Sequence, residues 1–328
     1  MLDTQPISCK SLENFFYVNG KQLEHQYVFH LSDFVTWEQR EHAADYVLFE
    51  KNLGSYLSID ETSLSQGELY TVITNKEAKG RSGCLVAMIQ GTSSDYINKI
   101  LSKLSRESRL KVKEITLDMA GSMQQIAKTS FPKAIRVTDR FHVQQLASDA
   151  VQELRIRYRW DAIEQENVER ALSKETGKSF KNERLANGDS LKQLLARSRY
   201  LLFKPQHKWT PSQFHRAELL FERFPDLEEA YKLSRELADI YSYSKIKGVA
   251  FTKLARWYDK VEKSGINSFQ VIKRTIQNHY ASILNFFENR STNASAESFN
   301  AKIKALRSQF RGVRNIEFFM FRLSKIYA

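Results

Sequence analysis

The chain has 328 residues, 42% of them hydrophobic and 12% aromatic, a composition that fits a packed globular protein and excludes an intrinsically disordered one. Its 50 Lys and Arg residues outnumber its 38 Asp and Glu residues, so the formal charge of +12 favours a polyanionic partner, either nucleic acid or an acidic membrane face. Cys9 and Cys84 lie far apart without a CxxC motif, which excludes a zinc finger within this chain, argues against a disulfide scaffold and predicts two reduced thiols.

The first 53 residues are predicted to be a leader that ends in a helix. Thr36 and Gln39 have capping-box spacing ahead of "HAADYVLFEKN", and Gly54 ends the predicted helix. The period then becomes strand-like. Three short runs rich in β-branched and aromatic residues predict a three-stranded meander: "YLSID" (56–60), "ELYTVIT" (68–74) and "CLVAMIQ" (84–90).

A crossover pattern follows the meander. "SSDYINKILSKL" is predicted to be a helix because its apolar residues share one face, and the strand-like runs "VKEITLD" (112–118) and "AIRVTD" (134–139) flank a brief helix at about 122–130. This order predicts an α/β fold with a mixed sheet, in which parallel strands extend the meander. Three of the predicted strands end in aspartate: Asp60, Asp118 and Asp139.

After Asp139 the strand pattern stops for about 150 residues, and the periodicity is helical. Thr210, Pro211 and Gln213 form a capping-box pattern within this block, and Gly265 breaks it further on. We therefore predict a large all-helical insertion. The predicted segments are a leader at 1–53, the first part of the core at 54–145, the insertion at 146–290, and the last core helix and C-terminus at 291–328.

The last predicted helix lies in "STNASAESFNAKIKALRSQF", residues 291–310. An apolar stripe of Phe299, Ile303, Leu306 and Phe310 opposes a stripe of Glu297, Asn300, Lys304, Arg307 and Arg311. One interpretation is an ordinary amphipathic helix whose acid complements the N-terminal end of the helix dipole. The other is a carboxylate held on a rigid element beside phosphate-binding cations, and it requires partner acids elsewhere.

Asp60 and Asp118 are candidate partners, because functional groups are commonly displayed at strand ends in α/β sheets. If the helix that bears Glu297 packs on the same sheet, three carboxylates converge and require cations, and hard oxygen ligands select Mg²⁺ or Mn²⁺. Two such ions about 4 Å apart would promote in-line attack on a phosphodiester. The alternative is that the two aspartates simply terminate strands.

Asp139 and His142 lie three residues apart in "DRFHV". The structural interpretation makes Asp139 a helix N-cap and His142 a packed helical histidine. The functional interpretation is that His142 contacts a scissile phosphate or positions a water molecule.

The series "LSIDETS", "ITLDMAGSM", "SFPKAIRVTDRFHV", a long helical interval and "STNASAESFNAKIKALRSQFRGVRN" resembles the DDE transposases of bacterial insertion sequences, specifically the ISL-three group, relatives of the mutator and hAT transposases. The resemblance covers roughly residues 54–328. It implies an RNase H-like core interrupted by an insertion before the last catalytic helix. It also implies that Asp60, Asp118 and Glu297 are the catalytic acids that hold two Mg²⁺ (or Mn²⁺) ions, and that Asp139 and His142 form the D-x-x-H signature.

The same resemblance implies metal-dependent cleavage of transposon ends, joining of the 3′-hydroxyl to target DNA, and a homodimer on paired DNA ends. Members of this group usually carry a zinc-binding and helix-turn-helix region ahead of the first acid. Here 59 residues precede Asp60, and they contain no cysteine cluster. Either a separate polypeptide is expected to recognise the transposon ends, or the chain is a truncated product.

Basic residues in two places are candidates for contact with the DNA backbone. Arg155, Arg157 and Arg159 alternate with Ile156, Tyr158 and Trp160, which fits either a solvated basic edge or a clamp whose rings stack on unpaired bases. The second set follows Glu297 along the chain and is predicted to contact phosphate: Lys302, Lys304, Arg307, Arg311 and Arg314.

Two other functions stay open at this point. An RNase H-like nuclease or junction resolvase would cut without joining, and a catalytically silent transposase derivative would only bind DNA. No apolar run approaches the roughly 20 residues that cross a bilayer, and the start "MLDTQPISCK" lacks a secretory signal pattern. We therefore expect no membrane partner and a cytoplasmic, nucleoid-associated bacterial protein.

Overall fold

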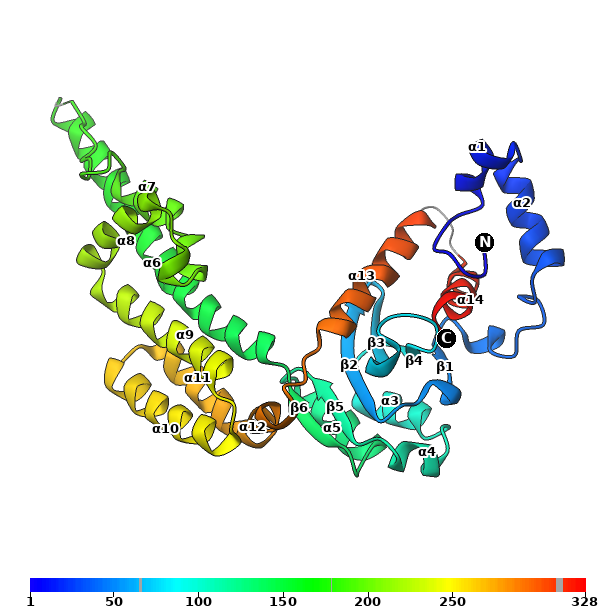
Figure 1. Cartoon of the computed structure of the whole chain (residues 1–328). Helices are drawn as coiled ribbons and strands as arrows, with labels where there is room; N and C mark the ends of the chain where they lie inside the picture. Colours follow the sequence, from blue (N-terminus) through cyan, green and yellow to red (C-terminus); the bar gives the residue numbers. More distant parts are fainter. Residues whose placement is uncertain (65–66, 178, 311–314) are drawn as a thin grey trace. The chain divides into compact units, whose positions relative to one another are not determined.

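The computed structural model describes residues 1–64, 67–177, 179–310 and 315–328, and these residues form two compact units (Figure 1). Unit 1 comprises Met1–Asp139 and Asn289–Ala328, and unit 2 comprises Arg140–Glu288. Unit 1 is therefore built from both ends of the chain. The divisions fall at 139/140 and 288/289, compared with the predicted 145/146 and 290/291, and the predicted leader lies inside unit 1.

A mixed sheet organises unit 1. Within the described residues it has six strands in the order β1-β4-β3-β2-β5-β6. The pairs from β1 to β2 are antiparallel, whereas β5 pairs in parallel with both β2 and β6. The α/β class and the mixed sheet are as predicted. The strands are β1 (Tyr46–Leu48), β2 (Tyr56–Ser63), β3 (Leu69–Asn75), β4 (Leu85–Gln90), β5 (Glu114–Leu117) and β6 (Ile135–Thr138).

Helices cover both faces of this sheet (Figure 1). One apolar cluster joins α3 and α5 to the face that carries Leu57 and Ile59 of β2. A second cluster joins α13 and α14 to the opposite face, where Phe299 of α13 shares the core with Val72 of β3. Because neighbouring strand residues point to opposite faces, Asp60 is directed toward α13. The helices of unit 1 are α1 (Glu13–Phe16), α2 (Gly20–Gln26), α3 (Ser94–Leu101), α4 (Arg106–Leu110), α5 (Gly121–Ser130), α13 (Ala294–Gln309) and α14 (Ile316–Tyr327).

Two sequence predictions in this unit are wrong. The run predicted as a helix before Gly54 contains strand β1, which pairs with β4, and the side-chain amide of Gln39 hydrogen-bonds the backbone N–H and carbonyl of Leu48 instead of capping a helix. Asp60 does not end its strand, because β2 continues to Ser63 along its antiparallel partner β3.

The regular elements of unit 2 within its described residues are all helical, as predicted, and loops join them. The capping box at Thr210 is confirmed, since Thr210 Oγ1 accepts from the Gln213 backbone at 3.3 Å and Gln213 Oε1 accepts from the Thr210 backbone at 3.2 Å. Gly265 ends α10 with a φ of 65°, a left-handed conformation that glycine adopts without strain. The helices are α6 (Arg140–Glu175), α7 (Leu191–Arg197), α8 (Pro211–Arg223), α9 (Pro225–Tyr243), α10 (Lys247–Ser264), α11 (Asn267–Asn278) and α12 (Tyr280–Asn289).

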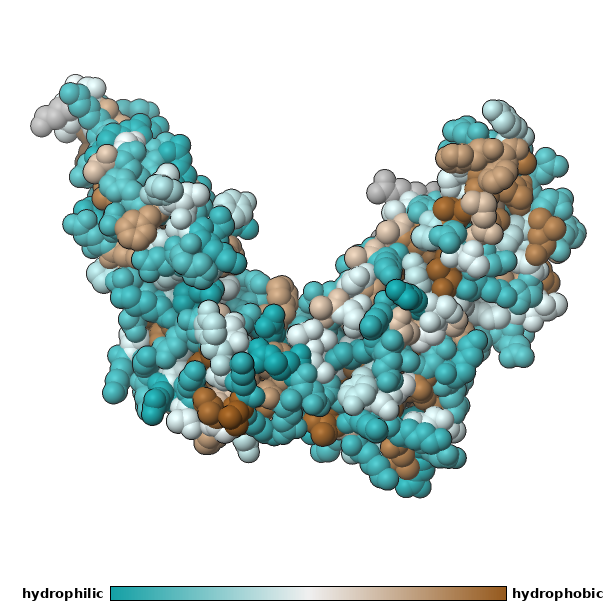
Figure 2. Space-filling view, viewed as in Figure 1, coloured by the Kyte–Doolittle hydropathy of each residue, from teal (hydrophilic) through white to brown (hydrophobic). Residues whose placement is uncertain are grey.

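The surface agrees with the charged composition, since hydrophilic residues cover much of the visible face (Figure 2). A brown patch lies over α1 in this view, and the helix contains Phe15 and Phe16, which are 78% and 55% exposed. A search of the helices in the described part of the chain finds none that is both long and apolar enough to span a bilayer.

Candidate active site

Asp60 and Asp118 lie at the same level on neighbouring parallel strands. The β2–β5 register pairs Ser58 with Thr116. Two residues further along both strands, this register places Asp60 opposite Asp118, which directly follows β5. Both aspartates are partly exposed. The strand pairing therefore brings together two carboxylates that are 58 residues apart in sequence.

Asp139 continues this row of acids. The backbone N–H of Asp139 donates to the carbonyl of Leu117 at 2.9 Å, so the third aspartate directly follows β6 beside the end of β5. Its side chain is 1% exposed, and no donor among the described residues reaches its Oδ1. Burial lowers the pKa of Lys76, while Glu114 and Asp139 act in the opposite direction. Asp139 thus interacts electrostatically with the partly buried cation of Lys76.

Helix α13 carries Glu297 over the same strand. Asn293, Glu297 and Asn300 follow one helical face at spacings of four and three residues. Asn293 Nδ2 donates to the carbonyl of Ile59 at 3.4 Å, and Asn300 Nδ2 donates to Oδ2 of Asp60 at 2.7 Å. Glu297 is exposed on the turn between these two contacts. The helix therefore presents Glu297 on the face that meets β2.

Backbone groups hold the two partly exposed aspartates. Oδ1 of Asp60 accepts from the N–H of Glu61 at 2.9 Å, and Oδ1 of Asp118 accepts from the N–H of Ala120 at 2.8 Å. Burial raises the pKa of Glu61, and the charges of Asp118 and Asp60 raise it further. Negative charge is therefore concentrated around Asp60 and Glu61 of β2 and around the end of β5.

The donor chemistry of this region fits a hard divalent cation, because carboxylate oxygens are the ligands that Mg²⁺ and Mn²⁺ prefer. Within the described residues, no group of three or more His, Cys, Asp or Glu side chains is close enough to hold a metal ion. The structure thus gives a register-matched pair of aspartates and an acid-bearing helix beside it, and the three-acid metal site stays a prediction.

The chain returning from unit 2 is anchored to β5 just before α13. Glu114 is 2% exposed and accepts hydrogen bonds from Asn289 Nδ2 at 2.9 Å and from Ser291 Oγ. Lys76 Nζ lies 3.9 Å from Oε1 of Glu114 and donates to Thr116 Oγ1 at 2.8 Å. This network holds residues 289–291 against the strand that leads to Asp118.

The basic residues of α13 differ in availability. Lys302 Nζ donates to the carbonyl of Gly80 at 2.9 Å, and Arg307 pairs with Glu68 at 3.3 Å with its side chain 10% exposed, whereas Lys304 is exposed. Arg311 and Arg314 lie outside the described residues. Lys304 is thus the described cation of this set whose surface is open to a phosphate.

The basic residues predicted to contact DNA in unit 2 also differ in exposure. Arg155 is 5% exposed and donates to Gln152 Oε1 at 2.7 Å and to the carbonyl of Leu195 at 2.8 Å. Burial lowers the pKa of Arg155, and the nearby charges of Arg159 and Arg199 lower it further. These contacts favour a packing role for Arg155, while Arg157 and Arg159 are exposed. His142 is partly exposed in the first turn of α6.

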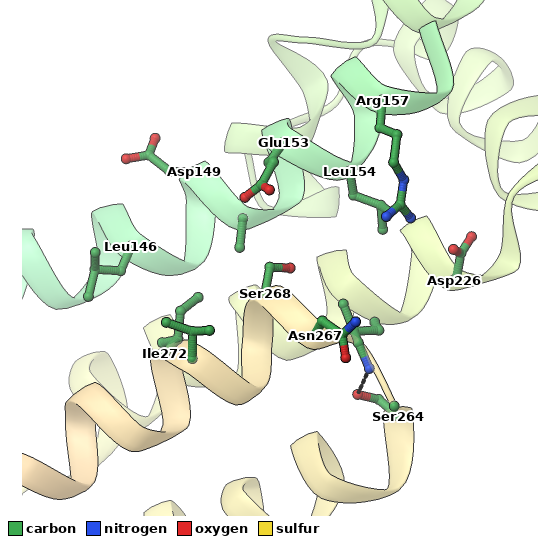
Figure 3. Close-up of a pocket in the computed structure, with 14 residues that line it drawn as sticks. Leu146, Asp149, Glu153, Leu154, Arg157, Asp226, Ser264, Asn267, Ser268 and Ile272 are labelled. Carbon is green, nitrogen blue, oxygen red and sulfur yellow. Dashed lines mark hydrogen bonds between the residues drawn. The ribbon is translucent and has the colours of Figure 1, made fainter. Parts of the chain in front are cut away.

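A pocket of about 680 Å³ lies among α6, α9 and α11 of unit 2 (Figure 3). Arg157 and Asp226 both line it, with Asp149 and Glu153 of α6. Of the described residues around this pocket, three are acids and Arg157 is the one base. This balance of charge disfavours a bound phosphate, so within the predicted Arg155–Arg159 clamp Arg159 is the better candidate for a backbone contact.

The residues missed by sequence reasoning, Glu61 and Asn300, adjoin the predicted acids. Glu61 follows Asp60 directly, and Asn300 lies on the predicted polar stripe of Glu297. The polar stripe could have indicated Asn300, because a residue one helical turn after Glu297 faces the same surface as Glu297.

Carboxylates displayed beside a sheet supply the hard oxygen ligands that metal-dependent phosphodiester chemistry uses. A family model described as "Transposase", for the ISL-three DDE group, matches residues 57–323. The match covers most of the chain and includes Asp60, Asp118 and Glu297, so the protein belongs to this transposase family.

The similar curated proteins are transposases for insertion sequence element IS1557 from two strains of Mycobacterium tuberculosis, CDC 1551 / Oshkosh and ATCC 25618 / H37Rv. Each is 25% identical over 251 residues, which are 76% of this chain and 55% of the relative. The chain thus spans about half the length of the curated relatives that it matches. No solved structure gives a significant match.

Proposed function

We propose that this chain catalyses the cleavage of transposon ends and the transfer of the resulting 3′-hydroxyl to target DNA, with Asp60, Asp118 and Glu297 as the catalytic acids. Family membership supports DNA transposition as the reaction class. The observation that carries the proposal is the register match of Asp60 and Asp118, together with the fastening of the Glu297 helix to Asp60 through Asn300.

The three acids are the proposed ligands of two Mg²⁺ or Mn²⁺ ions, which when bound would activate the attacking hydroxyl and stabilise the leaving oxygen. The backbone N–H groups of Glu61 and Ala120 orient one oxygen of Asp60 and of Asp118. Burial is the main cause of the raised pKa of Glu61, and the charges of Asp118 and Asp60 raise it further, which supports an acidic surrounding that a divalent cation would stabilise.

The fold proposed for the catalytic core is RNase H-like, with unit 2 as the insertion ahead of the last catalytic helix. The strand order supports it, since an antiparallel meander, β4-β3-β2, continues into the parallel strands β5 and β6. The helices on both faces of the sheet agree with such a layered core.

Further residues take supporting roles in the proposal. His142 contacts the scissile phosphate, and Asp139 tunes the electrostatics of the acid row through Lys76. Lys304, Arg157 and Arg159 are exposed and contact the DNA backbone, with Arg157 the weaker candidate because acids surround it in the pocket of unit 2. Transposon ends, target DNA, a second copy of the chain and a separate end-recognition polypeptide are the proposed partners, in a cytoplasmic, nucleoid-associated complex.

Strand cleavage and joining on transposon-end DNA in the presence of Mg²⁺ test this function. Asp60→Asn, Asp118→Asn and Glu297→Gln remove one charge each with little change of volume, and each is expected to lower both steps by roughly 100-fold or more. The matched control is Glu107→Gln, because Glu107 is 81% exposed and pairs only locally with Lys111. Unchanged activity in the three acid variants would overturn the proposal.

The products decide between this function and a related one. A transposase links a donor 3′ end to a new strand, and a labelled donor strand should therefore appear in longer products. Cleavage without any joined product would indicate a nuclease or resolvase instead. Cleavage that persists in excess chelator would remove the two-metal mechanism.

A further inference from the structure

Asn300 hydrogen-bonds the carboxylate of Asp60 from the helix that carries Glu297. Its side-chain nitrogen lies 2.7 Å from Oδ2 of Asp60 and 3.4 Å from the carbonyl oxygen of Glu61. Both neighbouring oxygens accept hydrogen bonds, so the amide must present its nitrogen to them. The side chain is 8% exposed, so water does not readily replace this contact.

The other end of the Asn300 amide is also informative. Among the described residues, no donor reaches Oδ1 of Asn300, although this oxygen is buried. An amide oxygen without a donor is unfavourable in a protein interior, and it is also a hard oxygen ligand of the kind that divalent cations accept. The Asn300 side chain therefore binds Asp60 through its nitrogen, and its single oxygen, Oδ1, is a further potential metal ligand next to the Asp60 carboxylate.

We propose that Asn300 is a positioning residue, which fixes the orientation of the Asp60 carboxylate and ties the first acid to the helix of the last one. This inference rests on the proposed function. Hydrogen bonds to a ligating carboxylate orient it, and their loss typically weakens metal binding by about 10–100-fold. Asn300 contacts Asp60 and lies three residues after Glu297, so displacing its amide would disturb both proposed ligands.

Asn293 provides a matched control on the same helix face. It is also an asparagine, 1% exposed, its Nδ2 also donates to β2, and no donor among the described residues reaches its Oδ1 either, so the contact with Asp60 is what distinguishes Asn300. Its acceptor is the backbone carbonyl of Ile59 at 3.4 Å, not a carboxylate. Asn293→Leu therefore removes a helix-to-strand contact while the hydrogen bond to Asp60 stays in place.

The experiment measures Mn²⁺ binding to the full chain without DNA, by electron paramagnetic resonance of the free ion, in parallel with thermal unfolding. Asn300→Leu is expected to weaken Mn²⁺ binding by about 10-fold or more, whereas Asn293→Leu leaves the affinity within about twofold of the wild type. Asp60→Asn marks the part of the signal that belongs to this site.

A second variant reverses the electrostatics and keeps the shape. Asn300→Asp places a carboxylate against Oδ2 of Asp60, so it is expected to unfold at a lower temperature, and Mn²⁺ should raise its unfolding temperature more than it raises that of the wild type. This measurement stands if Asn300→Leu does not fold.

The outcomes separate the two proposals. Wild-type affinity in Asn300→Leu, or an equal Mn²⁺ effect on Asn300→Asp and the wild type, would overturn the positioning role while the metal site stands. Mn²⁺ binding that Asp60→Asn does not change would overturn the proposed metal site itself and, with it, the role of Asn300.

Discussion

Glu114 allows a test of how the returning chain is held to the catalytic sheet. The carboxylate is buried in β5, accepts from Asn289 and Ser291, and lies 3.9 Å from Lys76 Nζ. Glu114→Gln keeps the size of the side chain, removes its charge and turns one acceptor oxygen into a donor. Lys76 then loses the carboxylate with which it pairs and keeps only the weaker influence of Asp139, and one hydrogen bond from the returning segment is lost.

The expected cost follows from this geometry. Removing one partner of a buried ion pair costs about 3–5 kcal/mol. The side chain of Lys76 is 16% exposed, and its nitrogen is 3.9 Å from the carboxylate, so the lower end of that range, about 3 kcal/mol, is expected. For a domain of this size each kcal/mol lowers the unfolding temperature by about 2–4 °C, which gives a decrease of about 6–12 °C.

Fluorine NMR of 5-fluorotryptophan-labelled protein reports each unit separately. Trp37 lies in unit 1, and the other three of the four tryptophans lie in unit 2, where they serve as an internal reference. The Trp37 resonance, which Trp37→Phe assigns, should show the lowered unfolding temperature of unit 1 in Glu114→Gln. Lys76→Met and the variant that combines it with Glu114→Gln complete a double-mutant cycle. The coupling free energy between the two residues should exceed about 1 kcal/mol. Additive effects, or a decrease below about 2 °C, would refute the reasoning.

Three other predictions concern the core, the pH dependence and DNA binding. Phe299→Ala empties a fully buried position beside Tyr327 and should cost about 3–5 kcal/mol in urea unfolding; a cost below about 1 kcal/mol would contradict the packing described. Burial raises the pKa of Cys9 from 9.0 to about 11, so the native state holds this proton more tightly than the unfolded chain. The resulting stability is present below about pH 9 and lost toward pH 11, a decline that Cys9→Ala should reduce and that an unchanged profile would exclude. Arg159→Ala should lower DNA affinity and reduce the slope of log affinity against log salt by about one, whereas Arg155→Met should lower stability and leave the slope unchanged; equal slopes in both variants would count against the Arg159 contact.

The strands were predictable where the residues of a segment themselves favour a buried strand. The runs that form β2 to β6 are rich in β-branched and aromatic residues, and the structure contains all five. β1 was missed because residues 46–48 form a strand only through pairing with β4, and because the Thr36–Gln39 spacing imitates a helix cap. Local pattern contains no information about a partner about 40 residues away.

The site was predictable to the extent that it follows from strand ends and helix faces. The parallel register of β2 and β5 aligns Asp60 with Asp118, whereas the strand-end pattern that suggested their proximity holds for Asp118 and not for Asp60. The burial of Arg155 was not predictable, since it depends on the carbonyl of Leu195 supplied by α7. The contact of Asn300 with Asp60 likewise required the docking of α13 on β2, which is a tertiary property.

The construction of unit 1 from both ends of the chain has a consequence for biosynthesis. About 150 residues separate the end of its first segment from α13, an interval of roughly 8–30 s at elongation rates of about 5–20 residues per second. Throughout that interval the sheet face that carries Val72 and Met88 lacks its covering helices. A nascent chain therefore exposes an apolar sheet face that is prone to aggregation. On the proposed assignment it is also inactive until α13, which carries Glu297, has been synthesised.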